Sequence, residues 1–317
     1  MIDKNHNKSC GFFIEIIMQK KLIVIGGPTA SGKTTLAIQL ATYFKTEIIS
    51  ADSRQFYREL TIGTAKPTNE ELSQAKHHFI NSHSINEHIN AGTYSIEAQK
   101  ILNNIFQIND VAILVGGSGL FINALIYGLD NLPKVEEPIR QTLKDEFKTI
   151  GLDSLLAELK NKDPDYYEKV DQQNHQRVMR ALEIIRTTGN PYSSYLGKNE
   201  NTNAYEVSSF VIDYSRDKLY HRINKRVDSM MDQGFLEEVK SLVSYRQHSA
   251  LQTVGYKELF EHLDGTYSLD EAIDLIKQHT RNYAKRQLTW FRHQGDFHFL
   301  VEEKSKNIYK QIIEKVK

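Results

Sequence analysis

The chain has 317 residues, of which 40% are hydrophobic and 25% are charged, as is usual for a globular protein in water. Its 40 basic and 40 acidic residues cancel, so a polyanionic partner would need a locally gathered basic surface. No apolar run approaches the length of a membrane span, and a single cysteine, Cys10, excludes an internal disulfide and a cysteine-rich zinc site, so we expect a cytoplasmic protein without a membrane partner.

The N-terminal segment MIDKNHNKSCGFFIEII has only a short apolar piece, which contains Glu15. It also lacks a small-residue cleavage site, so a signal peptide is not expected. Met18 directly precedes the first strand-like run. We therefore predict that residues 1–17 form a loosely ordered extension and that Met18 is the natural start.

The next stretch alternates strand-like and helix-like patterns. Short β-rich apolar runs at residues 21–26, 46–51 and 110–115 predict buried strands, and a helix is expected from about Thr34 to Tyr43. Strands that alternate with helices indicate βαβ units and a parallel sheet. The predicted fold class is therefore α/β, with a phosphate-loop type of parallel core that begins in residues 18–132.

From about Pro133 the pattern changes to helices only. Pro133 and Pro138 bracket a hinge-like stretch, after which residues 133–203 form a predicted helical insertion. Residues 205–213 read as a strand that returns to the sheet, and a long helix is expected at 270–293. Residues 204–317 are thus predicted to complete the core and add C-terminal helices.

The loop after the first predicted strand matches G-x-x-x-x-G-K-[ST] and opens a helix, the context in which this pattern binds phosphates. Its residues are Gly27, Pro28, Thr29, Ala30, Ser31, Gly32, Lys33 and Thr34. Inward-facing N–H groups and the helix N-terminus attract phosphate oxygens. Lys33 adds a positive charge, and the Thr34 hydroxyl is the predicted protein ligand of Mg²⁺. The motif indicates a phosphorylated ligand without saying which one.

The third predicted strand ends in ILVGGSG, without the acidic residue that usually holds Mg²⁺ in ATPases of this type. The nearest acidic candidate is Asp52, after the second strand. It follows a parallel strand, on the side of the sheet where α/β proteins bind ligands. The pattern alone leaves open whether Asp52 is a metal-associated acid, a catalytic base or a turn residue.

Two later helical patterns carry basic residues. Arg222 and Arg226 lie four residues apart, beside an apolar stripe, and either point at one diphosphate or form a solvated face. The 270–293 helix interleaves aromatic and basic residues, which suits an RNA backbone and unstacked bases, although a solvated helix face is the alternative. Its basic residues are Arg281, Lys285, Arg286 and Arg292. An apolar run at Leu120, Phe121, Ala124 and Leu125 either lines a pocket or packs in the core.

Eight stretches in register resemble the bacterial tRNA dimethylallyltransferase family, from about Met18 to the end of the chain. They are GGPTASGKT, ISADSRQFY, IGTAKP, VGGSGLFINALIYGL, QRVMRALEI, QGFLEEV, TVGYKEL and TRNYAKRQLTWFR. The resemblance implies transfer of a dimethylallyl group from its diphosphate to N6 of an adenine beside the tRNA anticodon, at position 37. We also expect the enzyme to act as a monomer.

The resemblance also implies roles for individual residues. Thr29 through Thr34 would cradle the donor diphosphate, with Arg222 alongside, and Asp52, Lys33, Thr34 and Arg226 would be catalytic. Ser118 stands where the family usually has Thr and keeps the hydroxyl. The residues expected to contact tRNA are Asp52, Ser53, Arg54, Gln55, Ser118, Arg140, Gln176, Arg177, Arg180, Gly255, Tyr256, Lys257, Arg281, Lys285 and Arg286. We expect the insertion, with Arg177, Arg180 and Arg186, to hold the anticodon stem-loop.

Three other functions are compatible with parts of the sequence. An isopentenyltransferase acting on free adenine nucleotides would share the phosphate loop and Asp52, but it would need neither the insertion nor the TRNYAKRQ helix. A nucleotide kinase is disfavoured by the missing acid after the third strand. A non-catalytic RNA-binding module leaves the phosphate loop unexplained.

Overall fold

The computed structural model describes residues 19–87, 89–197, 204–301 and 307–316. The predicted extension at residues 1–17 lies outside them. The chain divides into two compact units, the first made of Met1–Ile89, Glu97–Ile122 and Ala204–Lys317, the second of Asn90–Ile96 and Asn123–Asn203. Within the described ranges, none of the helices combines the length and the apolar character that crossing a membrane requires.

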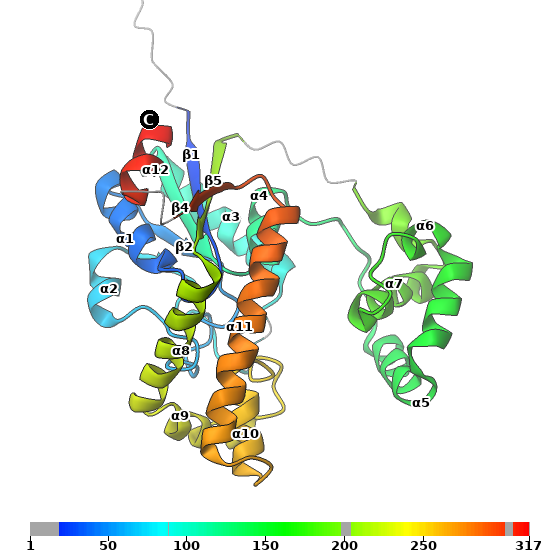
Figure 1. The fold of residues 1–317 in the computed structure, drawn as a ribbon. Coiled ribbons are helices and arrows are strands. Elements are labelled where there is room, and N and C mark those ends of the chain that lie inside the picture. Colours follow the sequence, from blue (N-terminus) through cyan, green and yellow to red (C-terminus); the bar gives the residue numbers. More distant parts are fainter. Residues whose placement is uncertain (1–18, 88, 198–203, 302–306, 317) are drawn as a thin grey trace, which may run out of the picture. The chain divides into compact units, whose positions relative to one another are not determined.

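The first unit is built on a six-stranded sheet in which every pairing is parallel, which confirms the predicted α/β class (Figure 1). The order is β3-β2-β4-β1-β5-β6. The strands are β1 (Lys21–Gly26), β2 (Ile48–Ser50), β3 (His77–His78), β4 (Val111–Gly116), β5 (Glu206–Asp213) and β6 (His298–Val301).

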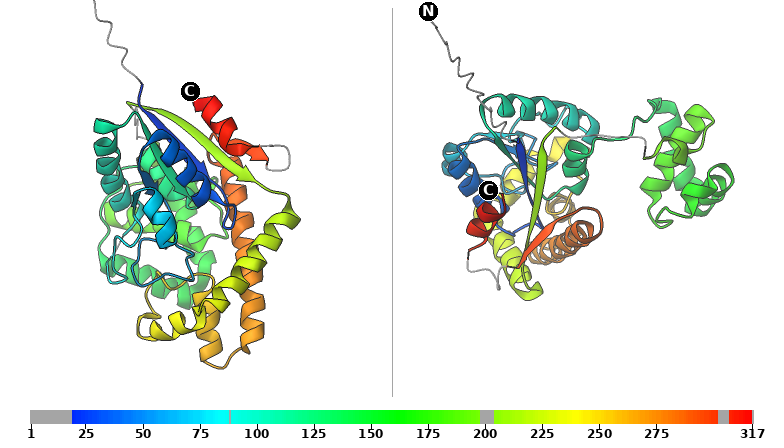
Figure 2. Two further views of the ribbon diagram at one scale, coloured as in Figure 1. Left: turned by 90° about the vertical axis from the view of Figure 1, so that its left-hand side faces the viewer. Right: turned by 90° about the horizontal axis from the view of Figure 1, so that it is seen from above.

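Helices cover both faces of this sheet, because successive side chains of a strand point to opposite faces and both sets are apolar. Ile23, Ile113 and Phe210 share one buried cluster with α1 (Lys33–Phe44) and α12 (Ile308–Val316). Helix α3 (Ala91–Ile108) lies on the opposite side of the sheet from α1 (Figure 2).

The carboxyl ends of β1, β2 and β4 bring three loops together at one edge of the sheet. The backbone N–H of Ala51 donates to the Val115 carbonyl (2.7 Å), and that of Ser118 donates to the Ala51 carbonyl (3.3 Å). A Cβ added at Gly116 would overlap the backbone of Ala51, so this strand pair needs glycine there. The loop after β1 therefore lies beside the segments that begin at Ala51 and Gly117.

The C-terminal half adds helices below this edge (Figure 1). They are α8 (Arg216–Asp232), α9 (Phe235–Ser241), the short 3₁₀ turn at Val243–Tyr245, α10 (Tyr256–Leu263) and α11 (Leu269–His293). Helices α8 and α11 pack side by side, with Leu219 and Ile223 of α8 buried against Ala284 of α11. The apolar stripe predicted beside Arg222 and Arg226 thus includes the packing face of α8, with Leu219 and Ile223.

The C-terminal part of helix α11 packs against three glycines. Added Cβ atoms at Gly26, Gly117 and Gly119 would overlap, respectively, Phe291, Gln287 and Trp290 of α11. Gly119 opens α4 (Gly119–Ile126). Because these positions carry no side chain, α11 approaches the backbone after β1 and β4 directly. The glycines therefore set how closely α11 lies to the loops at the sheet edge.

The second unit contains a helical bundle, in the part of the chain where the insertion at residues 133–203 is predicted. Its elements are α5 (Glu137–Lys162), α6 (Pro164–Tyr167), α7 (His175–Thr188) and a 3₁₀ turn at Tyr192–Tyr195. Helices α5 and α7 bury Leu155, Leu159 and Leu182 between them. Gly151 has φ 79°, which bends α5 so that both of its halves reach α7.

Arg186 of α7 is part of this packing. Its guanidinium donates to Glu146 (2.7 Å) and to Glu158 (2.5 Å), both on α5. The two carboxylates raise the pKa of Arg186 further above its already high value. Arg186 therefore stabilises the packing of α5 against α7, and the expectation that it also helps to hold an RNA stem-loop stays a prediction.

The predicted elements agree with the structure except for the shortest and a few ends. Strand β5 and helix α11 are each within one residue of prediction, whereas β2 is shorter than the 46–51 expected. Strands β3 and β6 were not predicted, because two and four residues are too few to give a hydrophobic period. They extend the two edges of the sheet, away from the loops after β1, β2 and β4.

Candidate active site

The loop between β1 and α1 has the backbone conformation of a phosphate-binding turn. Gly27 has φ 143° and Gly32 has φ 81°, in the region that disfavours residues with a Cβ. No side chain caps the start of α1. The first N–H groups of this 12-residue helix therefore face the loop and, with the helix dipole, favour an anion there.

Two polar groups of this loop are desolvated. The Lys33 ammonium donates to the Pro28 carbonyl (2.7 Å), and burial lowers the pKa of Lys33 to about 8, although the nearby Asp52 carboxylate opposes the shift. The Ser31 hydroxyl is buried and has no hydrogen-bond partner within the described residues. Both groups would be stabilised by phosphate oxygens, which offer charge to one and hydrogen bonds to the other.

Both arginines of α8 reach the same loop. Arg222 donates from Nε to the Ala30 carbonyl (2.7 Å), and its guanidinium lies 5.1 Å above the Tyr214 ring. Burial lowers the pKa of Arg226, and Asp52 partly offsets this effect. The geometry therefore brings two guanidinium groups and Lys33 to one place, the arrangement predicted for a diphosphate.

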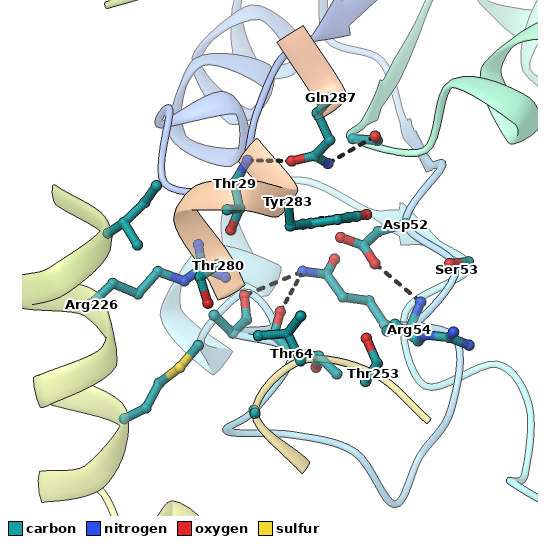
Figure 3. Close-up of a pocket in the computed structure, with 18 of the residues that line it drawn as sticks. Thr29, Asp52, Ser53, Arg54, Thr64, Arg226, Thr253, Thr280, Tyr283 and Gln287 are labelled. Carbon is teal, nitrogen blue, oxygen red and sulfur yellow. Dashed lines mark hydrogen bonds between the residues drawn. The ribbon is translucent and has the colours of Figure 1, made fainter. Parts of the chain in front are cut away.

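A cavity of about 230 Å³ opens from the phosphate loop between α8, α11 and the loops after β2 and β4 (Figure 3). Thr29, Lys33, Asp52 and Arg226 line its polar side. Its apolar lining consists of Val115, Ile223, Val227, Met230, Phe235, Val254 and Ile276. A ligand that joins a charged group to a small apolar group fits such a lining.

The apolar run at residues 120–125 does not contribute to this cavity. Phe121, Ala124 and Leu125 are buried, and Leu120 is 58% exposed. Phe121 packs against Phe56, with ring centroids 5.5 Å apart. Of the two interpretations of this run, core packing holds for its three buried members. Apolar residues of α8, α9 and α11 take the pocket-lining role instead.

Asp52 lies where the cationic and neutral parts of the cavity meet. Its Oδ1 accepts a hydrogen bond from the backbone N–H of Arg54 (3.0 Å), and Figure 3 shows its carboxylate beside the Tyr283 ring. This contact is a local turn, one of the roles considered for Asp52. The turn fixes Oδ1, and Oδ2 is the oxygen that we assign to a ligand. The turn thus orients the carboxylate rather than competing with a chemical role.

Gln55 is held in one orientation by the loop at residues 61–66. Its amide nitrogen donates to the carbonyls of Thr64 and Ala65, both at 3.2 Å. Both amide N–H groups are thus used, and Oε1 is the part of the Gln55 amide left to face the cavity. This wall therefore presents a hydrogen-bond acceptor, which suits a ligand amine.

Gln287 was not among the predicted site residues, yet it links two of the loops (Figure 3). Its Oε1 accepts from the backbone N–H of Thr29 and its Nε2 donates to the Gly117 carbonyl, both at 2.9 Å. It is 8% exposed and lies on the buried stripe of α11 with Ala284 and Phe291. A polar residue at helical spacing on an otherwise apolar stripe is the signal that could have identified it.

The predicted tRNA-contacting residues of the first unit fall into two groups. Lys257, Lys285 and Arg286 are exposed, and Ser53 and Arg54 stand at the cavity rim. Others are engaged within the protein. Arg281 donates to Asn224 (2.8 Å) and lies over Tyr220, Tyr256 is buried, and the Gly255 N–H donates to Glu258 (2.7 Å).

In the second unit, Gln176 and Arg177 are exposed at the start of α7. Arg180 donates to Glu183 (2.7 Å), and Arg140 lies 3.7 Å from the same carboxylate. Glu183 thus gathers Arg140 and Arg180, which come from different helices. Arg177 is the most accessible of the three cations, since it is exposed whereas Arg140 and Arg180 are half-buried.

A family model described as IPP transferase matches residues 55–294 of this chain. The tRNA dimethylallyltransferase 1 of Bacteroides fragilis is 43% identical over 289 residues, which cover 91% of this chain and 96% of the relative. The tRNA dimethylallyltransferase of Flavobacterium johnsoniae is 46% identical over 86% of this chain and 90% of its own length.

Solved structures give the same similarity. The tRNA isopentenylpyrophosphate transferase of Bacillus halodurans aligns with a TM-score of 0.68 and 36% identity, over 94% of each chain. A eukaryotic dimethylallyltransferase acting on tRNA aligns with a TM-score of 0.75 and 27% identity, over 93% of this chain and 78% of that one.

Removing the link made by Gln287 should loosen the phosphate loop. We expect Gln287→Ala to weaken binding of inorganic pyrophosphate roughly 3- to 10-fold, because a lost hydrogen bond typically costs about 0.5–1.5 kcal/mol. Thr289→Ala, on the exposed side of the same helix, serves as the control. Titration calorimetry measures both, and equal affinities for the two variants would contradict this role.

Proposed function

The chain belongs to the IPP transferase family, and on that premise we propose that it moves a dimethylallyl group from dimethylallyl diphosphate to N6 of the adenine at position 37 of tRNA. The observation that carries the proposal is the cavity in which a cationic phosphate loop meets an apolar wall and Asp52. The relatives are named as tRNA enzymes, which disfavours free adenine nucleotides as acceptors.

The donor diphosphate binds to the loop of residues 27–34. Its oxygens accept hydrogen bonds from the open N–H groups of α1 and pair with Lys33, Arg222 and Arg226. When the allylic C–O bond breaks, the electron pair leaves with the diphosphate oxygen, so negative charge grows where these cations converge. Such preorganised charge stabilises the transition state more than the ground state.

Mg²⁺ is the expected companion of the diphosphate. Within the described residues, no cluster of three His, Cys, Asp or Glu side chains is placed to hold a metal ion. Mg²⁺ bound with phosphates, however, needs only one or two protein oxygens and keeps several waters. Thr34, which lines the cavity with Asp52, fits that need. Bound there, Mg²⁺ would neutralise part of the diphosphate charge.

The acceptor amine binds on the Asp52 side of the cavity. The exocyclic nitrogen of adenine is a poor nucleophile, because its lone pair is delocalised into the ring. As the bond from N6 to the allylic carbon forms, Asp52 accepts the N6 proton through Oδ2. Gln55 accepts a hydrogen bond from the same amine through Oε1. A carbonyl oxygen at that position, as in guanine, would repel Oε1.

The apolar wall from α8, α9 and α11 receives the five-carbon tail. A target base that is stacked in an anticodon loop cannot reach this depth and has to be flipped out, which costs a few kcal/mol. Exposed cations such as Arg177 and Lys285 offset this cost by binding phosphates of the RNA backbone. We expect the enzyme to work in the cytoplasm as a monomer.

The function is tested by incubating the wild-type protein with dimethylallyl diphosphate, Mg²⁺ and undermodified tRNA, and with AMP in parallel. Mass spectrometry of the digested nucleosides should show adenosine heavier by one dimethylallyl group. Transfer to AMP but not to tRNA would favour the free-nucleotide alternative. No transfer to either would contradict the proposal.

Two variants distinguish a role of Asp52 as a proton acceptor from its role in the local turn. Asp52→Asn retains an Oδ1 that can accept from Arg54 but cannot take a proton, and Asp52→Ala loses both. We expect each to lower kcat by roughly 10²- to 10⁴-fold, the usual effect of general acid–base catalysis. Pyrophosphate affinity should change much less. A near-normal kcat for Asp52→Asn would leave Asp52 with the turn alone.

The electrostatic grip on tRNA is tested by salt dependence. Each phosphate contact contributes about −0.7 to −0.9 to the slope of log K against log salt. Arg177→Ala and Lys285→Ala should each weaken tRNA binding and flatten that slope by about one unit. Arg246→Ala is the control, since Arg246 is already paired with Asp264. Unchanged slopes in both test variants would mean that the RNA is held elsewhere.

A further inference from the structure

The carboxylate of Glu238, on α9, holds the backbone of the loop at residues 61–63. Its Oε2 accepts from the N–H groups of Thr61 (3.1 Å) and Ile62 (2.7 Å), and its Oε1 accepts from that of Gly63 (3.1 Å). The buried Tyr256 hydroxyl donates to the same Oε1 at 2.6 Å. Four donors thus converge on one side chain.

The held loop is the support of Gln55. Residues 63–65 line the cavity directly, and the carbonyls of Thr64 and Ala65 accept both N–H groups of the Gln55 amide. Glu238 and Gln55 are therefore linked through the backbone of one short loop, which each of them contacts by hydrogen bonds. Oε1 of Gln55 stands beside the place assigned to the acceptor amine.

Packing fixes the loop from the same helix. The Phe235 ring, one turn before Glu238, lies so close to Gly63 that a Cβ there would overlap it. The same ring lies 3.0 Å from the position of a Cβ on Gly255, which also lines the cavity. Helix α9 thus sets the loop by an apolar wedge and by a carboxylate, which leaves its carbonyls little freedom to move.

We propose that Glu238 is a positioning residue for the transfer reaction, acting through the loop at 61–65 to fix the amide of Gln55 against the acceptor base. This inference rests on the proposed function, in which Gln55 accepts a hydrogen bond from the acceptor amine. Glu238 itself touches neither substrate. It sets which atom of Gln55 the base meets.

Only a carboxylate suits this position. Two oxygens offer enough lone pairs for all four donors, whereas a glutamine places an NH₂ group against N–H groups that need an acceptor. Glu238→Gln therefore keeps the size of the side chain and breaks the loop's support. The neighbouring Glu237 is the matched control, because it is exposed and forms an ion pair with Lys240 of the same helix.

The test is a double-mutant cycle measured as kcat/KM for tRNA at saturating donor. Glu238→Gln should lose roughly 10- to 100-fold, in line with the cost of a small misplacement at a reacting centre. Gln55→Ala should lose a similar factor. Because Glu238 acts through Gln55, the two losses should not multiply. The double variant should have about the same kcat/KM as the less active single variant. Glu237→Gln should match wild type, and pyrophosphate affinity should be unchanged throughout.

Hydrogen–deuterium exchange gives a readout that does not need turnover. The amides of Thr61, Ile62 and Gly63 should exchange faster in Glu238→Gln than in wild type, with α1 and α11 unchanged. If that variant does not fold, Tyr256→Phe removes a single donor to Glu238 and should give a smaller change of the same kind. Unchanged exchange at these amides would overturn the proposal.

The kinetic outcomes separate this proposal from the proposed function. A wild-type protein that prenylates no tRNA contradicts the proposed function and, with it, any role of Glu238 in that reaction. A wild type that prenylates tRNA, with losses in Glu238→Gln and Gln55→Ala that multiply in the double variant, contradicts only the role of Glu238.

Discussion

The parallel register of β1, β2 and β4 is the constraint on which the rest of the site depends. Because the three strands end together, the phosphate loop, Asp52 and the segment at Gly116 and Gly117 have to share one edge of the sheet. The hydrogen bonds of Ala51 to Val115 and Ser118 hold these segments at backbone contact. The chemistry assigned to the site needs this closeness, since donor and base must meet within one cavity.

The helices around this edge divide the cavity by polarity. Helices α1 and α8 supply N–H groups, the Lys33 ammonium and the Arg226 guanidinium on one side, and the loops after β2 supply acceptors on the other. Helix α11 joins the sides through Gln287, which contacts the phosphate loop and the Gly117 carbonyl. In the proposed reaction, the leaving anion and the attacking amine thus bind on two sides of one cavity.

The sequence predicted the parts of this site that are local in the chain. Short patterns, whose meaning does not depend on distant residues, indicate β1 with the phosphate loop after it and β2 with Asp52 after it. The helical spacing of Gln287 marks it as a buried polar residue, but the loops that it and Glu238 hold lie more than 150 residues away in the chain, so local patterns do not reveal those contacts. Tyr256 shows the same limit, since its motif indicated a ligand contact while the fold buries its ring.

The packing of α11 against Gly26, Gly117 and Gly119 limits which parts of the site can be engineered. A side chain at Gly26 or Gly119 would overlap the ring of Phe291 or Trp290, and one at Gly117 would displace the Gln287 amide that links two loops. The lining from α8, by contrast, includes the apolar side chains of Ile223, Val227 and Met230, of which Met230 is the most flexible. A designer seeking an enzyme that accepts longer prenyl chains should therefore enlarge the α8 wall and leave the glycines untouched.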